Sequence, residues 1–250
     1  MKDLKMKVVS NRRIAENIFD LILDGPEELR LEPGSFVNLQ LPGFFLRRPL
    51  SVCDLDGNRL RLIYKKVGDG TDRMTCLQEG MSLSVLVGLG RGFRVEAASG
   101  RPILVGGGVG IPPLYYLAKK LVNLGIKPDV LLGFNKEADL ILQKEFEDLG
   151  CPVTVYSVDG SVGKKGLVTQ DLDRLTGQEP APYFFSCGPL PMLRALYRSM
   201  EERGWTGQLS LEERMGCGFG ACMGCSIETK SGPKRVCKEG PVFDKEDLLW

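Results

Sequence analysis

Hydrophobic residues in the first ~100 positions alternate with polar ones in short runs, the pattern of half-buried β-strands. Clusters of glycine, proline and aspartate separate the runs, as tight turns require. Strands this short and this closely spaced predict a small antiparallel β-barrel. They are expected at residues 4–10, 18–24, 35–41, 48–54, 59–67 and 82–87.

After residue 100 the pattern changes, because short apolar runs begin to alternate with segments of helical periodicity. Leu114, Leu117, Leu121 and Leu124, for example, share one face of a helix expected to begin near Pro112. Strands that alternate with helices indicate βαβ units and a parallel sheet. The expected strands are 102–105, 129–134, 151–158, 183–188 and 207–213, and the expected helices 112–124, 139–150, 167–175 and 189–204.

These patterns predict a β plus α/β protein of three parts. An antiparallel barrel covers residues 1–98, a parallel α/β domain covers 99–206, and a small cysteine-bearing lobe covers 207–250. The change from barrel to α/β domain is expected near Ser99 and Gly100. No internal repeat interrupts this order.

Composition and charge exclude several classes of protein. The chain has 33 basic and 32 acidic residues, so its net charge of +1 gives no reason to expect a nucleic-acid partner. The N-terminus has no apolar signal segment, and no apolar run approaches the ~18 residues of a membrane span. We therefore expect a cytoplasmic protein. There is no histidine, which excludes Ser–His and Cys–His nucleophiles and histidine-ligated metals.

Four of the eight cysteines are concentrated near the C-terminus with the spacing C-x4-C-x2-C-x11-C. The order is typical of plant-type [2Fe-2S] centres, and the surrounding glycines allow a loop to wrap a cluster and offer backbone N–H groups to its sulfurs. Tetrahedral zinc is the alternative, although only one C-x2-C pair is present. Cys53, Cys76 and Cys151 are expected to be small buried residues. The predicted cluster ligands are Cys217, Cys222, Cys225 and Cys237.

Two stretches of the barrel, "LRRPLSV" and "LIYKKVGDGT", resemble the FAD domain of the ferredoxin reductase superfamily. By itself the basic pair could be an exposed start of a strand. A guanidinium group suits phosphate oxygens, so Arg48 is expected to bind the FAD pyrophosphate. The resemblance implies that Ser51 hydrogen-bonds the flavin and that the remaining residues line its site or donate to its phosphates: Pro49, Leu50, Ile63, Tyr64, Lys65, Gly70 and Thr71.

The stretch "LVGGGVGIPPL" places glycines between a strand and a helix, where exposed N–H groups suit a pyrophosphate. It is not G-x-G-x-x-G, and a tight turn without a ligand would explain it too. It resembles the superfamily's nucleotide-binding turn. Asn135, Lys136 and Glu137 follow the second strand without an arginine pair, which favours NAD over NADP. The expected nucleotide residues are Gly107, Gly108, Gly110, Asp159 and the turn Cys187, Gly188 and Pro189.

Together, the flavin-like barrel, nucleotide-like domain and cysteine lobe resemble the electron-transfer subunits of NAD-dependent, heteromeric dihydroorotate dehydrogenases. This resemblance implies FAD, a [2Fe-2S] cluster and NAD as cofactors and co-substrate, and no catalytic side chain of the chain's own, because the cofactors carry the chemistry. It also implies an FMN-containing catalytic partner, in a heterotetramer of two copies of each chain, acting in pyrimidine biosynthesis. The alternatives are a reductase subunit serving ferredoxin or hydrogenase and, in another class, a zinc-bearing nucleotide-binding protein.

Overall fold

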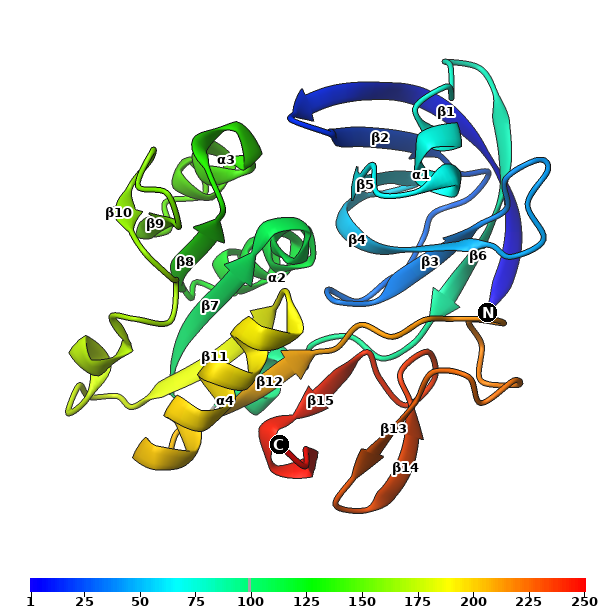
Figure 1. The fold of residues 1–250 in the computed structure, drawn as a ribbon. Helices are drawn as coiled ribbons and strands as arrows, with labels where there is room; N and C mark the ends of the chain where they lie inside the picture. Colours follow the sequence, from blue (N-terminus) through cyan, green and yellow to red (C-terminus); the bar gives the residue numbers. More distant parts are fainter. Residues whose placement is uncertain (99) are drawn as a thin grey trace.

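The first six strands close into an antiparallel barrel in the computed structural model, which describes residues 1–98 and 100–250 (Figure 1). Around the barrel the strands follow the order β1-β2-β5-β4-β3-β6. Alternate side chains such as Met6, Leu21 and Val37 fill the interior and are fully buried, as the period of two predicts. The elements are β1 (Lys2–Ala15), β2 (Ile18–Asp24), β3 (Phe36–Leu39), β4 (Arg48–Asp56), β5 (Arg59–Lys65), the short helix α1 (Asp69–Met74) and β6 (Ser82–Leu89).

The second half is built on a seven-stranded sheet in the order β10-β9-β8-β7-β11-β12-β15. All neighbours run parallel except β15, which pairs antiparallel with β12. Its strands are β7 (Arg101–Gly107), β8 (Asp129–Phe134), β9 (Val153–Ser157), β10 (Lys164–Lys165), β11 (Pro182–Cys187), β12 (Thr206–Ser210) and β15 (Val242–Asp244). The β plus α/β class predicted from the sequence is confirmed.

Helices cover both faces of this sheet because its strands are apolar on both sides. Leu104 of β7 packs with α2 (Ile111–Asn123) and α3 (Gln143–Asp148), whereas its neighbours Ile103 and Val105 pack with α4 (Leu190–Arg203). Short 3-10 turns complete the domain at Val95–Ala97, Gly108–Gly110, Glu137–Asp139, Leu172–Leu175 and Lys245–Asp247. No helix in the described ranges is long and apolar enough to cross a bilayer.

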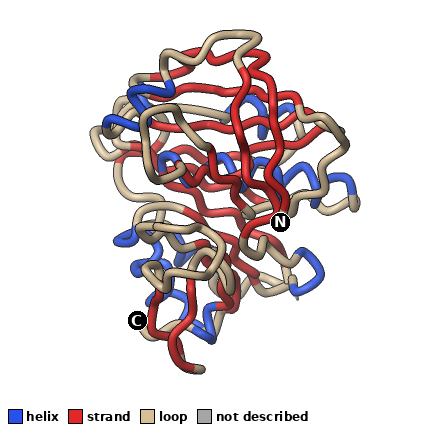
Figure 2. The backbone as a smooth tube through the Cα atoms, turned by 90° about the vertical axis from the view of Figure 1, so that its right-hand side faces the viewer, coloured by secondary structure: helices blue, strands red, loops and turns tan. Residues whose placement is uncertain are grey.

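The C-terminal lobe is a hairpin of β13 (Ser226–Thr229) and β14 (Gly232–Arg235) with the cysteine loop before it (Figures 1 and 2). The lobe lies against both the barrel and the sheet. Cys225 and Cys237 share a buried core with Phe36 of the barrel and with Phe184 and Leu209 of the sheet. The cysteine loop is thereby held at the junction of the two larger parts.

Three local predictions differ from the structure. The expected helix 167–175 is wrong, because only the 3-10 turn Leu172–Leu175 forms in this segment. The expected helix 139–150 shortens to Gln143–Asp148, because Leu142 has a φ of 62°. Cys76 is exposed, although Cys53 and Cys151 are buried as expected.

Two of the predicted domain boundaries can be compared with the structure. Ser99 lies outside the described residues, so the expected change at that position stays a prediction. The limit between residues 206 and 207 falls inside β12, which pairs with β11 in the large sheet. Residues 206–210 thus belong to the large sheet, and the expected limits of the three parts stay predictions.

Candidate functional site

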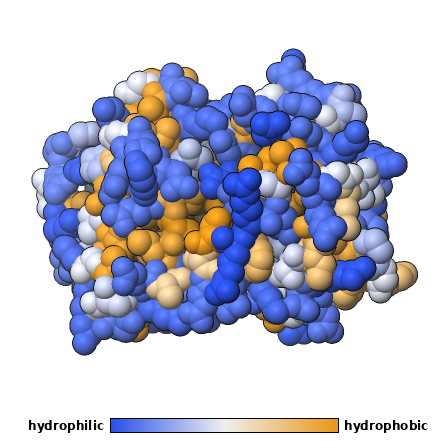
Figure 3. Space-filling model, turned by 90° about the horizontal axis from the view of Figure 1, so that it is seen from above, coloured by the Kyte–Doolittle hydropathy of each residue, from blue (hydrophilic) through white to orange (hydrophobic). Residues whose placement is uncertain are grey.

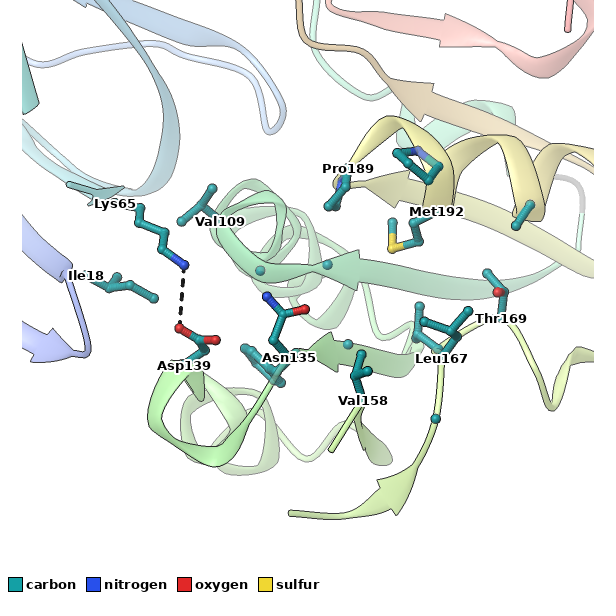
Figure 4. A pocket seen from close by; sticks show the side chains of 18 residues that line it. Ile18, Lys65, Val109, Asn135, Asp139, Val158, Leu167, Thr169, Pro189 and Met192 are labelled. Carbon is teal, nitrogen blue, oxygen red and sulfur yellow. Dashed lines mark ion pairs between the residues drawn. The ribbon is translucent and has the colours of Figure 1, made fainter. Parts of the chain in front are cut away.

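A cavity of about 270 Å³ opens where the barrel meets the carboxyl ends of the parallel strands (Figure 4). The barrel contributes Ile18 and Lys65, and the ammonium group of Lys65 lies 3.5 Å from the carboxylate of Asp139 on the opposite wall. Apolar side chains gather between the two halves when the molecule is viewed from above (Figure 3). The remaining lining is mostly apolar and comes from Gly107, Gly108, Val109, Gly133, Phe134, Asn135, Val158, Gly166, Leu167, Val168, Thr169, Pro189, Pro191, Met192 and Ala195.

The position of this cavity follows from the strand order. Successive strands leave β7 in one direction toward β8 and in the other toward β11, so the sheet has its switch point between β7 and β11. Ligands of open α/β sheets bind outside the carboxyl ends of the strands at such a point, since the two following loops diverge there. The glycine turn after β7 and the turn Cys187–Pro189 after β11 both lie at this place.

Glycine is required in these turns partly by protein packing. A methyl group on Gly110 would lie 2.5 Å from the carbonyl of Cys187 and from the Cα of Gly188, and one on Gly107 would lie 2.7 Å from the Met192 sulfur. Gly108 differs, because its φ is +52° and nothing lies within 4 Å of a methyl group built there. Packing therefore explains Gly107 and Gly110, while Gly108 presents bare backbone to the open cavity.

The thiol of Cys187 lies beside this turn. Burial raises its pKa to about 12, and a hydrogen bond with Ser210 opposes the shift only in part. The thiol is therefore neutral at physiological pH. The neutral sulfur therefore adds no charge to the turn Cys187–Pro189, beside which the nicotinamide ring is expected to bind.

On the barrel, Arg48 and Gly70 lie side by side. The guanidinium group of Arg48 stacks 4.6 Å from the ring centre of Phe44 and donates to the carbonyl of Leu46 at 2.5 Å. A methyl group on Gly70 would lie only 1.9 Å from Arg48 Nε. The absence of a side chain at Gly70 thus leaves room for the guanidinium group against the first turn of α1.

The other expected flavin residues divide into two groups. Leu50 and Ser51 are half-buried and Pro49 is exposed, all on β4, whose backbone pairs with β3. The side chains of Ile63 and Tyr64 are buried, and the Tyr64 hydroxyl donates to Asn11 Oδ1 at 3.1 Å. Only backbone at these two positions is free to meet a ligand.

The hydroxyl group of Thr71 stabilises the turn formed by residues 67–71. It accepts the N–H groups of Val67 and Gly68 at 2.8 and 3.1 Å and donates to the Gly68 carbonyl. Asp159 likewise holds a turn, accepting from the N–H and hydroxyl of Ser161 at 2.9 and 2.6 Å. Ser161 in turn accepts the N–H of Glu137, and Asp159 itself is not among the residues lining the cavity.

The four C-terminal cysteines lie in one lobe as two pairs. Cys217 Sγ accepts the N–H groups of Ala221 and Cys222 at 3.2 and 3.4 Å, and the Cys217 N–H points to Cys222 Sγ at 3.5 Å. In the second pair, the Cys237 N–H points to Cys225 Sγ at 3.4 Å. Within residues 1–98 and 100–250 no set of three or more histidine, cysteine, aspartate or glutamate side chains surrounds a single ion position.

The loop favours a thiolate at its open end. Burial opposes ionisation of Cys217, but the N–H groups of Phe219, Cys222 and Ala221 outweigh it and lower its pKa to about 6. In the buried pair, burial followed by the neighbouring Cys225 thiol raises the pKa of Cys237 to about 12. Cys225 and Cys237 are 2% and 1% exposed, whereas Cys222 is exposed. Two thiol pairs with N–H donors on sulfur are the donor set that a two-iron cluster needs, two thiolates for each iron.

An ion pair braces this loop. Arg235 Nε donates to Glu239 Oε2 at 3.0 Å, and Arg235 Nη1 donates to the carbonyl of Gly220 at 2.6 Å. The guanidinium group lowers the pKa of Glu239 to about 2. The hairpin therefore holds the cysteine loop from the side opposite the barrel.

Sequence reasoning missed several cavity residues. Ile18, Val158, Met192 and the segment 166–169 carry no recognisable motif, because they supply apolar surface rather than a donor. Asp139 could have been found only from its partner Lys65, which lies on another part of the chain.

Known proteins match this arrangement along almost the whole chain. The model of the iron–sulfur cluster binding domain of dihydroorotate dehydrogenase B matches residues 212–249, and the oxidoreductase NAD-binding domain matches residues 104–198. The electron transfer subunit of dihydroorotate dehydrogenase B (NAD(+)) from Lysinibacillus sphaericus is 42% identical, with 96% of each chain covered. The chain belongs to this family. The Bacillus cereus (strain G9842) member is 40% identical, with 97% of each chain covered.

Solved structures agree with the assignment to this family. A chain of the NADH-dependent reduced ferredoxin-NADP oxidoreductase, described for flavin-based electron bifurcation, is 31% identical with a TM-score of 0.89. That match covers 98% of this chain and 90% of the other. An Amycolatopsis cytochrome P450 reductase is 26% identical with a TM-score of 0.72, covering 81% of this chain and 66% of that one. The barrel followed by a parallel α/β domain is thus shared with reductases of several kinds.

Proposed function

We propose that this member of the dihydroorotate dehydrogenase B family is the electron-transfer subunit of a two-chain enzyme that oxidises dihydroorotate with NAD⁺. The observation that carries the proposal is the cavity between the barrel and the carboxyl ends of β7 and β11. A flavin held by the barrel and a nicotinamide held at the switch point would meet there. The chain is an oxidoreductase subunit without a catalytic side chain of its own.

The residues present fit the three groups that the family implies. FAD and a [2Fe-2S] cluster supply hydride exchange with NAD and single-electron transfer, respectively. Arg48, beside the bare backbone of Gly70, would hold phosphate oxygens, and the β4 backbone with Ser51 would hold the ring. Cys217 and Cys222 would ligate one iron, and Cys225 and Cys237 the other.

The nucleotide would bind with its pyrophosphate against Gly108 and its nicotinamide near Cys187–Pro189. Lys136, which follows β8 where the ribose would be expected, is paired with Glu16 at 2.5 Å. Because this pair neutralises the ammonium group, a 2′-phosphate gains no free cation there. We therefore infer NAD rather than NADP.

The partner would be an FMN-containing catalytic subunit, two copies of each chain forming a heterotetramer. Electrons would enter at the cysteine lobe, where Phe219 and Met223 are exposed beside Cys222. The described cysteines all carry free thiols, which suits the cytoplasm. A second candidate is a ferredoxin-linked subunit, since one 31% identical structure is a ferredoxin-NADP oxidoreductase.

The deciding experiment is reconstitution. The chain is produced with the FMN-containing, dihydroorotate-oxidising subunit of the same organism, and NADH formation from dihydroorotate and NAD⁺ is followed. Turnover that requires both chains supports the proposal. A flavin- and iron-loaded chain that reduces dyes with NADH but never couples to that subunit refutes the partner and favours the ferredoxin-linked candidate. A colourless, zinc-containing preparation made anaerobically would refute the redox function altogether.

A further inference from the structure

One buried amide lies between the barrel and the cysteine loop without a role in either core. Asn38 of β3 is 1% exposed, and its Oδ1 is the one buried side-chain oxygen or nitrogen within the described ranges that has no hydrogen-bond partner. Strand periodicity points this side chain to the same face as Phe36, out of the barrel. Phe36 packs with Cys225 and Cys237, whereas Val37 and Leu39 fill the barrel interior.

The other end of the amide faces the cysteine loop. A methyl group on Gly218 would lie 2.3 Å from Asn38 Nδ2, and Gly218 has a φ of +77°. Gly218 follows Cys217 directly. The amide nitrogen is thus packed against the backbone of the loop whose N–H groups already point to Cys217 Sγ.

The backbone of Asn38 connects this loop to the expected flavin strand. Asn38 pairs with Pro49 of β4, next to Arg48, and its carbonyl accepts from Arg47 Nη1 at 3.3 Å. Its position is therefore fixed from the flavin side, and its side chain ends at the cluster side. No other described residue with a buried unpaired polar atom occupies this junction.

We propose that Asn38 is a positioning residue for electron transfer: its side-chain amide packs against Gly218, keeps the Cys217 loop against the flavin strand, and offers its Nδ2 N–H group to a sulfur of the cluster. The inference rests on the proposed function. Reduction adds negative charge to a cluster, and an N–H donor stabilises the reduced form more than the oxidised one. Loss of the donor makes the cluster harder to reduce.

The test compares Asn38→Leu with the wild-type holo-chain. Leucine keeps the number and branching of the side-chain heavy atoms and removes the donor. We expect unchanged FAD and iron content, altered g-values of the reduced cluster, and an approximately tenfold lower ratio of reduced to oxidised cluster at a fixed potential, which is ~59 mV for a one-electron couple. The matched control is Gln40→Leu on the same face, whose amide donates to the Phe44 carbonyl at 2.9 Å and not to the cysteine loop.

The outcomes separate this inference from the proposed function. A wild-type chain without flavin and two irons overturns both. A loaded Asn38→Leu chain with a wild-type midpoint and g-values overturns the inference alone. If the variant does not fold, pulsed EPR of the reduced wild-type cluster with ¹⁵N-asparagine decides: a ¹⁵N coupling supports the donor, and its absence overturns it.

Discussion

The substitution Gly70→Ala tests the flavin site without replacing Arg48, the arginine expected to bind phosphate. The added methyl group would lie 1.9 Å from Arg48 Nε and 2.6 Å from its Cζ, so the guanidinium group must move. An ordinary contact needs about 3.4 Å or more, which implies a displacement of more than ~1 Å. Hydrogen bonds to phosphate tolerate only about 2.7–3.2 Å, so the displaced group loses its contact.

The magnitude follows from the bond that is lost. A charge-assisted hydrogen bond contributes about 1.5–3 kcal/mol, which corresponds to a roughly ten- to hundredfold weaker affinity for FAD. Stability should not fall, because Gly70 lies within α1 and alanine is favoured over glycine in a helix by about 0.8–1 kcal/mol. We expect a variant that unfolds at the wild-type temperature or higher and releases its flavin readily.

The assay is titration of the FAD-free chain with FAD, followed by flavin fluorescence, with Tm measured on the same samples. Arg48→Ala gives the full effect of losing the guanidinium group. The matched control is Arg47→Ala: that neighbouring arginine is held by Asp3 and Ser84 at 2.7 and 2.9 Å, and its loss should leave FAD affinity unchanged. Wild-type affinity in both Gly70→Ala and Arg48→Ala would refute the phosphate role of Arg48.

Three further predictions concern the remaining sites. Cys225→Ser should lose the cluster and partner-coupled turnover but still oxidise NADH with artificial acceptors; iron analysis and dye reduction check this, and retained coupling would contradict it. Gly110→Ala has ordinary dihedral angles (−82°, −10°), so only the 2.5 Å contact with Cys187 and Gly188 acts; it should raise the KM for NADH and cost about 1–3 kcal/mol of stability by overpacking. The pKa of Cys187 is about 12 in the folded chain against an ordinary 9.0. Its contribution to stability is therefore complete below pH 9 and is lost as the pH rises through 12, by about 1.4 kcal/mol for each unit; denaturation curves of wild type and Cys187→Ala should converge across that range.

The hydrophobic periodicity of the sequence was sufficient to predict the fold class, because each buried position of a strand or helix requires an apolar residue. Met6, Leu21 and Val37 are apolar since they fill the barrel, and the apolar runs of β7 and β8 reflect a sheet covered on both faces. Hydrophobic periodicity does not predict helix bounds correctly where the backbone adopts an unusual conformation. The left-handed backbone at Leu142 makes α3 begin at Gln143, although the periodicity had placed the start of that helix at residue 139.

Ligand-binding residues could be predicted from the sequence wherever the chemistry of the ligand requires one residue type at a fixed spacing. Thiols for iron, an arginine for phosphate and glycines where two turns touch all belong to this class, and the structure brings Arg48 to Gly70 and Gly110 to Cys187. The spacing also predicted that the four cysteines lie in one small lobe. It could not say that they form two pairs, because pairing depends on how the loop folds back.

By itself, then, the sequence determined the order of the parts and the chemistry available to them, since both are local properties. Only the tertiary structure decided where the parts meet. Lys65 reaches Asp139 across the cavity, and Asn38 meets Gly218 at the cysteine loop, between residues far apart in the chain. Such contacts are set by the closure of the barrel and the strand order of the sheet, for which no single segment carries a signal.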